Sequence, residues 1–186
     1  LILKASAGLL SGLIILSIAT CVIDYKQRAD FVKKTTNEMC SHDLDINKSA
    51  PVIARHEILI DAPIERVWNT LTSINDWRKW QSSISFVQID SYPEKGVSFN
   101  WVSDGITFHS TIHTNRYLKT FGWTGTTWGA QAIHNWHFIQ EGEKTKVTVV
   151  ESLQGILVQI LTGYFQDNLN TGMQTNLREL KRSCEQ

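Results

Sequence analysis

The sequence is short of the residues that would point to a cross-linked or highly charged protein. Three of its 186 residues are cysteines and three are prolines, and 18 basic side chains balance 18 acidic ones. Cys21, Cys40 and Cys184 show no metal-ligand spacing and do not suggest a disulfide framework, so we expect free thiols. The alternative, a Cys40–Cys184 bridge, requires an exported domain. Zero net charge without a basic stripe argues against a nucleic-acid partner.

Motifs for cofactor and metal chemistry are also missing. The chain contains neither a GxGxxG motif nor a P-loop, so we expect no cofactor. His109 and His113 lie four residues apart on a predicted strand but lack a third ligand, so we expect no metal site. Because Ile106, Phe108 and Ile112 take the inner face of that strand, both histidines are expected to face solvent.

Aromatic residues, by contrast, are abundant. The chain has seven tryptophans and seven phenylalanines. Rings in this number fill a core, line an apolar ligand site, or do both.

Residues 1–30 are predicted to be a membrane anchor or a signal segment. The 19 residues from Ala5 to Ile23 contain no charge. As a helix they would span about 28 Å, close to one hydrocarbon core. Because Ser17-Ile18-Ala19 fits a small-residue cleavage site, an uncleaved anchor and a cleaved signal peptide both stay open, as does a soluble amphipathic helix.

The flanking charges leave the side of the membrane undecided. Four basic residues follow the apolar run and only Lys4 precedes it, which by the positive-inside rule would keep the later domain in the cytoplasm. The sequence does not begin with Met, and charges further upstream would alter this balance. The protein is therefore expected either to be held at a membrane by one N-terminal anchor or to be exported. Residues 31–50 are polar and aperiodic, and are interpreted as a linker with some helix near its start.

Residues 51–186 are predicted to form one domain that begins with a strand over 52–60 and two short helices over 63–72 and 75–80. Asp61 is expected to cap the first helix, with Pro63 in its first turn. The apolar residues of this helix follow the spacing i, i+3, i+4 and i+7, which is typical of one buried face: Ile64, Val67, Trp68 and Leu71.

The rest of the domain is predicted to be strands followed by one long helix, an α+β fold in which the helix lies across a curved antiparallel sheet. The strands form a meander, with the 52–60 strand pairing at one edge, and they cover Ile84–Asp90, Val97–Ser103, Ile106–Arg116, Phe121–Thr127, Ala132–Gln140 and Lys146–Ser152. The helix, from Ile156 to Ser183, carries an apolar stripe of Leu157, Leu161, Phe165, Leu169, Met173, Leu177 and Leu180, widened by Ile160 and Tyr164.

Several short motifs of this domain occur together: Ile60-Asp61-Ala62-Pro63, Val67-Trp68, Ile74-Asn75-Asp76-Trp77 with Trp80, His134-x-Trp136-x-Phe138 followed by Thr145-x-Val147 and Glu151-x-x-x-Gly155, and Leu177-x-x-Leu180-Lys181. Through them, residues of about 54–184 resemble the START/polyketide-cyclase superfamily (SRPBCC, with the helix-grip, Bet v 1-like fold), in particular its polyketide cyclase/dehydrase-like members. The resemblance implies a deep apolar cavity between the sheet and the long helix. It further implies a role in binding or carrying lipids, quinones, sterols or polyketides, with chemistry in only some members.

The last hairpin brings two polar residues to the inner face of the sheet. With a turn at Gly142-Glu143, His134 pairs with Glu151 among apolar neighbours. A buried carboxylate is costly unless it is paired, and His134 is the obvious partner. The pair would act as an acid/base or as a ligand anchor, or it would only hold the register.

Other candidates surround this pair. Trp77 and Trp80 are expected either to gate the cavity or to pack the helical pair against the sheet. Tyr164 and Asn168 would either hydrogen-bond a ligand head group or mark the edge of the stripe. The full set expected to line the cavity is Trp80, Phe99, Trp101, Phe121, Trp123, His134, Trp136, Phe138, Val149, Glu151, Tyr164, Phe165 and Asn168.

Three functions fit these observations. The favoured one is a membrane-tethered or exported module that binds or transfers a hydrophobic small molecule such as a lipid, a quinone or a polyketide. The second is a cyclase, dehydratase or isomerase that uses His134 and Glu151, although no nucleophile, base and orienting group can be read together. The third is a protein-interaction module with a vestigial cavity. Replacing either residue of the pair by alanine would distinguish the first two, since an enzyme would lose turnover and a carrier only affinity.

Overall fold

The chain folds into one curved antiparallel sheet with a long helix on each side of it. The computed structural model describes the backbone of residues 2–186 and the side chains of residues 17–186. Its elements are α1 (Ile2–Met39), β1 (Val52–Ile60), α2 (Ile64–Thr72), the 3₁₀ helix η1 (Ile74–Lys79), β2 (Ile84–Gln88), β3 (Ser98–Ser103), β4 (Ile106–Arg116), β5 (Thr120–Thr127), β6 (Ala130–Glu141), β7 (Lys144–Gln154), α3 (Ile156–Ile160) and α4 (Thr162–Cys184).

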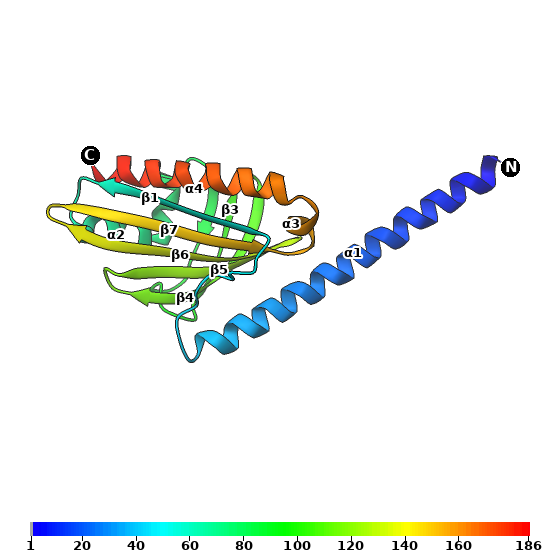
Figure 1. Cartoon of the computed structure of the whole chain (residues 1–186), viewed down its shortest axis with the longest axis horizontal. Helices are drawn as coiled ribbons and strands as arrows, with labels where there is room; N and C mark the ends of the chain where they lie inside the picture. The colour runs from blue at the N-terminus through cyan, green and yellow to red at the C-terminus, as the bar shows by residue number, and fades with distance from the viewer. Residues whose placement is uncertain (1) are drawn as a thin grey trace.

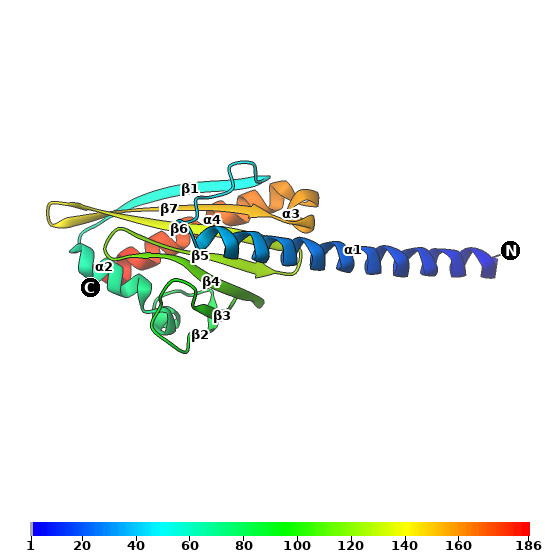
Figure 2. The same ribbon diagram turned by 90° about the horizontal axis from the view of Figure 1, so that it is seen from below.

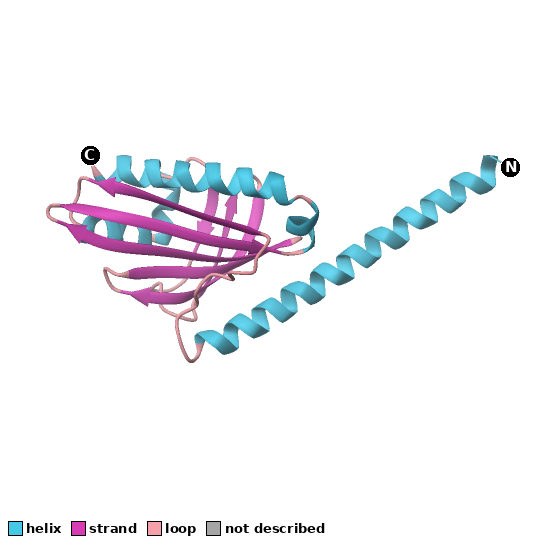
Figure 3. Ribbon diagram, viewed as in Figure 1, coloured by secondary structure: helices cyan, strands magenta, loops and turns pink. Residues whose placement is uncertain are grey.

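The sheet confirms the predicted meander. Its seven strands follow the order β1-β7-β6-β5-β4-β3-β2, so the first strand pairs with the last at one edge. Figures 1 and 3 show α4 along the inner side of this sheet, with α2 tucked against the end near the C-terminus. The order of strands and helices is the one expected from the sequence.

The last hairpin has the predicted register. Glu141 pairs with Lys144 across the turn, Phe138 with Val147, and His134 with Glu151. Gly142 occupies the turn at φ 61°, a left-handed conformation that glycine adopts without steric cost.

The first short helix buries the predicted face but is not capped by Asp61. Its N-cap residue is Pro63, and no side chain caps the helix. The amide of Ile64 instead donates to the side-chain oxygen of Gln140 at 3.0 Å, because the β6–β7 hairpin reaches the start of the helix. Asp61 pairs with Lys144 on the surface. The buried residues of the helix are Ile64, Val67, Trp68 and Leu71.

The C-terminal helix is broken, which corrects the prediction of one continuous helix from Ile156 to Ser183. Helix α3 ends at Ile160, and Leu161 leaves helical geometry at φ −117° and ψ 39° before α4 begins. The break turns Val158 inward against Val52 and Ala130. It leaves three residues of the expected apolar stripe exposed, while the C-terminal half is buried as predicted; the exposed residues are Ile160, Leu161 and Tyr164.

Helix α1 covers the opposite face of the sheet, and it continues through Met39 into the segment expected to be a linker. Figure 2 shows it crossing in front of β5 and β6, with its N-terminal end projecting past the end of the sheet at which α3 lies. Phe31 and Met39 pack with Leu44 and Ile133 against this outer face. The buried carboxylate of Asp24 accepts the backbone N–H of Gly129 at 2.8 Å.

Within the described part of the chain, no helix combines the length and apolar character that crossing a bilayer requires. Residues 5–16 of the expected membrane segment Ala5–Ile23 lie outside the side chains that the structure describes. The three cysteines are free thiols, with Cys184 buried and both others exposed, so the Cys40–Cys184 bridge is not formed.

Two glycines of β5 compare the packing of the two faces of the sheet, since Gly122 lies on the outer face and Gly125 on the inner one. A Cβ at Gly122 would lie 2.7 Å from Cε1 of His113 and 2.9 Å from the carbonyl oxygen of His134, whereas a Cβ at Gly125 would meet no atom closer than 3.4 Å. We predict that Gly122→Ala lowers the free energy of unfolding by about 2 kcal/mol through overpacking. The matched Gly125→Ala should change it by less than about 0.5 kcal/mol. Urea denaturation measures both, and equal effects would contradict this packing.

Candidate functional site

A cavity of about 270 Å³ lies between the inner face of the sheet and the N-terminal half of α4. Its wall is mostly aromatic and aliphatic, and a small number of polar groups converge on it, which is the usual composition of a small-molecule site. The expected residues that line it are Trp101, Trp123, His134, Trp136, Glu151, Phe165 and Asn168.

The structure places six expected residues outside this cavity. Four of them are buried in the closed core at the other end of the sheet, where Met173, Leu177 and Leu180 fill the space. Tyr164 is 64% exposed, because the break at Leu161 turns it away from the sheet. Trp80 packs against the core without lining the cavity. The four core residues are Phe99, Phe121, Phe138 and Val149.

Trp77 supports the packing interpretation of the tryptophan pair. It is buried, and its indole N–H donates to the carbonyl oxygen of Leu71 at 2.7 Å. Its ring lies edge-on to Phe99 and Trp101 and tilted against Trp123. A side chain held in this way forms part of the wall.

The centre of the site is the pair of His134 and Glu151. Nδ1 of His134 forms a hydrogen bond with Oε2 of Glu151, between directly opposed positions of β6 and β7. The imidazole stacks on Trp123 with ring centroids 4.4 Å apart and planes at 12°. Trp136, two residues further along β6, also lies beside the imidazole, and the centroids of the two rings are 5.5 Å apart. The sequence therefore predicted the pair, and the stacking fixes the orientation of its ring.

Other residues line the cavity that were not in the expected set. Asn176 lies two helical turns after Asn168, with Gly172 between them, and all three line the cavity from α4. The i, i+4 spacing of small and polar residues beside the apolar stripe was the signal for this wall. Gln131, which is almost fully buried, was also missed.

One end of the cavity, which we call its mouth, lies at the β3–β4 and β5–β6 turns and the start of α4, where apolar side chains are exposed. The turns on either side of it contribute Ile106 and Ala130 to the cavity wall, and α4 contributes Phe165. The same segments expose large apolar residues to solvent, which we call the apolar rim: Ile106, Trp128, Ile160, Leu161 and Tyr164.

On the outer face, His113 corrects the expectation that both histidines of β4 face solvent. His109 is exposed and bonded to Asn100, but His113 is fully buried. It lies at a β-bulge between Ile112 and Thr114 and donates or accepts a hydrogen bond with the Thr114 hydroxyl at 2.8 Å. Burial under residues 40–51, which we call the strap, lowers the pKa of His113 to about 4.

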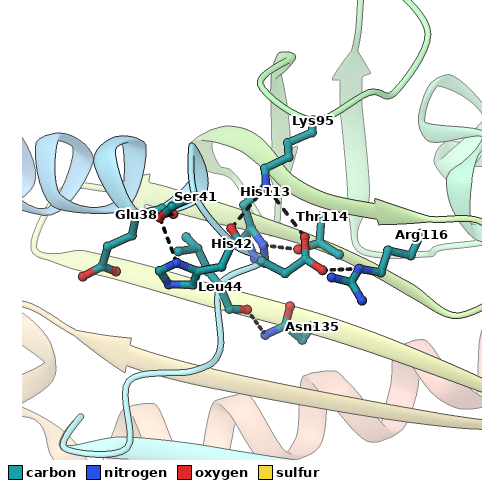
Figure 4. Close-up of polar contacts among 10 residues, drawn as sticks. Glu38, Ser41, His42, Leu44, Lys95, His113, Thr114, Arg116 and Asn135 are labelled. Carbon is teal, nitrogen blue, oxygen red and sulfur yellow. Dashed lines mark hydrogen bonds and ion pairs between the residues drawn. The ribbon is translucent and has the colours of Figure 1, made fainter.

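The strap is held across the outer face by polar contacts. Asp43 forms ion pairs with Arg116 and, at 3.7 Å, with Lys95. Nδ2 of Asn135 donates to the carbonyl oxygen of Leu44 at 3.1 Å. Figure 4 shows these groups gathered around His113. Among the described residues, no three histidine, cysteine, aspartate or glutamate side chains are grouped to hold a metal ion.

Comparison with known proteins agrees with this architecture. Residues 51–185 match the family described as polyketide cyclase/dehydrase and lipid transport. No curated protein is similar enough to count as a relative.

Solved structures share the fold at low sequence identity. A hypothetical protein, jhp0584, from Helicobacter pylori aligns with a TM-score of 0.67 at 14% identity, over 77% of this chain and 98% of its own. The ZhuI aromatase/cyclase from Streptomyces sp. R1128 aligns at 0.62 and 11% identity, over 72% and 93%. TTHA0849 from Thermus thermophilus aligns at 0.58 and 17% identity, over 71% and 96%. Sequence identities this low support a shared fold only, so the chemistry has to be inferred from the site itself.

The buried His113 predicts an acid-labile fold. Because its pKa is lowered from 6.5 to about 4, the unfolded chain binds the proton more readily. The stabilisation by the neutral ring is complete above pH 6.5 and is lost as the pH falls toward 4, amounting to roughly 3 kcal/mol at most. His113→Gln should flatten this slope in urea denaturation between these pH values, and His109→Gln should not. Burial also lowers the pKa of His137, so part of the pH dependence should remain in His113→Gln. An unchanged slope in His113→Gln would contradict the assignment.

Proposed function

This chain belongs to the polyketide cyclase/dehydrase and lipid transport family, and we propose that it binds a hydrophobic small molecule in the cavity between the sheet and α4. The observation that carries the proposal is the composition of that cavity. An aromatic and aliphatic wall surrounds one buried polar pair, His134 and Glu151. A vestigial cavity would be expected to have filled with side chains, as the other end of this sheet has.

The size of the cavity suggests what fits. About 270 Å³ is near the lower end of ligand sites, which hold drug-sized molecules in about 300–1,000 Å³. We propose a compact ring system, or the terminal portion of a longer lipid, quinone or polyketide whose remainder extends through the mouth. Asn168 and Asn176, which line the cavity from α4, would meet polar groups along the ligand.

Binding without chemistry accounts for the site better than an enzyme does. The acid/base alternative rests on the same pair, and a histidine oriented by a carboxylate is a plausible general base. However, Trp123 and Trp136 flank the imidazole, and among the described residues no charged group other than Glu151 lines the cavity. An apolar wall with one anchoring pair is suited to holding a ligand.

We further propose that the ligand is exchanged at a membrane surface. The apolar rim surrounds the mouth, and exposed apolar groups in such a cluster mark a surface for apolar partners. Helix α1 includes the uncharged run from Ala5 to Ile23. Its N-terminal end projects past the end of the sheet at which α3 lies. An anchor there would present the rim and the mouth to the bilayer.

Filling the cavity tests the binding proposal. A Cβ at Gly172 would meet no atom within 4 Å, and this residue lines the cavity. We predict that Gly172→Leu abolishes retention of the co-purifying molecule, seen as at least about a tenfold loss of the bound species in native mass spectrometry. Stability should be unchanged or raised by up to about 1 kcal/mol, since leucine is the better helix former.

Gly163→Leu is the matched control for this experiment. Gly163 lies on the same helix with no atom within 4 Å of its Cβ, but it does not line the cavity. This variant should retain the ligand. Wild-type protein that carries nothing and takes up nothing from a host lipid extract would contradict the binding function. Retention of the ligand by Gly172→Leu would show that the ligand binds at another site.

The apolar rim predicts a specific defect in transfer. Replacing Trp128 and Ile160 together by serine should slow exchange of the co-purified molecule between the full chain and phospholipid vesicles by about tenfold, because less apolar surface enters the lipid. Ile139→Ser provides the control, as Ile139 is similarly exposed but lies near the β6–β7 turn, away from the mouth. Equal exchange rates for all three proteins would reject the membrane-docking role of the rim.

A further inference from the structure

The cavity contains polar atoms that the protein itself leaves without partners. Nε2 of His134 and Nε1 of Trp136 are both buried, and neither has a hydrogen-bond partner. Both residues line the cavity and are neighbours on the same face of β6. Leaving buried polar atoms unpaired costs free energy, and in a ligand site such atoms mark where the ligand supplies the missing hydrogen bonds.

Glu151 decides which kind of hydrogen bond Nε2 can make. An ionised carboxylate only accepts hydrogen bonds, so the contact between Glu151 and Nδ1 of His134 places the proton on Nδ1. In the neutral imidazole, Nε2 then carries the lone pair and acts as an acceptor. This atom therefore calls for a donor from the ligand.

The position of Nε2 is also fixed. Rotation of the imidazole is opposed by the parallel stack on Trp123 and by the contact of Nδ1 with Glu151. Trp136 adds a donor nearby, since its indole N–H can only donate and its ring centroid is 5.5 Å from that of His134. One wall thus offers an acceptor and a donor on neighbouring positions of one strand face. Nε2 of Gln131, also on β6, is a further unpaired donor in the cavity.

We propose that the ligand carries a hydroxyl group that donates to Nε2 of His134 and accepts from Nε1 of Trp136. A hydroxyl is the small group that does both, whereas a carbonyl or ether only accepts. This inference rests on the proposed binding function and narrows its ligand to a hydroxylated ring compound or an alcohol with an apolar body. It uses Glu151 as a positioning residue that sets the histidine tautomer.

Two matched probes test the inference on the full chain. 2-Naphthol has a hydroxyl, and 2-methoxynaphthalene has an oxygen that only accepts. Isothermal titration should show that the wild-type protein prefers 2-naphthol by about tenfold, the effect of one hydrogen bond to a buried acceptor. Gly172→Leu should bind neither probe, which locates them in the cavity.

Variants of the polar pair separate this role from a structural one. In Glu151→Gln, the new amide can donate to Nδ1 and shift the proton of the ring to Nε2, so the preference for 2-naphthol should fall to about twofold or less. Trp136→Phe keeps an aromatic side chain but removes the N–H donor, and it should weaken the binding of 2-naphthol by roughly threefold to tenfold. ¹⁵N NMR of the imidazole, assigned with His134→Phe, should show a protonated Nδ1 and an unprotonated Nε2 that shifts on addition of 2-naphthol.

The outcomes distinguish this inference from the function on which it rests. Binding of both probes with equal affinity, or a proton on Nε2 in the free protein, would overturn the hydroxyl assignment while cavity binding stands. Failure of the wild-type protein to bind either probe would count against the cavity as a ligand site, and against the hydroxyl assignment with it.

Discussion

The register of the β6–β7 hairpin is the constraint on which the site depends. A tight turn at Gly142 and Glu143 pairs Glu141 with Lys144, and each further pair follows by the two-residue period of a strand. His134 and Glu151 therefore lie opposite each other on the same face. A shift of either strand by one residue would move one of the two to the outer face and break the pair. The hydrogen bonds of two long strands maintain this arrangement.

The break at Leu161 determines where the sheet stays open. Beyond it, α4 lays Met173, Leu177 and Leu180 into the curved sheet and closes one end. Before it, α3 turns aside to bury Val158. The space between, lined from α4 by small and polar residues, is left for the cavity. The same break exposes Ile160, Leu161 and Tyr164, so the cavity and this part of the rim have one cause.

Part of the outer face of the sheet is shielded from solvent, because α1 and the strap cover it. Asp24 of α1 bonds to Gly129, whose carbonyl oxygen accepts the amide of Leu157 in α3 at 3.1 Å. Gly129 also precedes Ala130, a residue of the cavity wall. The N-terminal helix is thus joined by short contacts to the turn and the helix at the mouth. Through this connection, a membrane-proximal α1 would hold the mouth at the same membrane surface.

Local pattern and turn chemistry were sufficient for most of the secondary structure of residues 51–186. Alternation and helical spacing predicted every strand and the first two helices of the domain, and the hairpin turn predicted the pairing of His134 with Glu151. These features depend on neighbours in sequence or on one strand pair, which the sequence determines by itself. The extent of the cavity, the break at Leu161 and the burial of His113 were decided only by the tertiary structure. Each depends on which distant segment covers a face: the core end of α4 excluded Phe121 and Phe138 from the cavity, and the strap covered a histidine that alternation alone assigns to solvent. No periodicity along one strand records what packs against it from elsewhere in the chain.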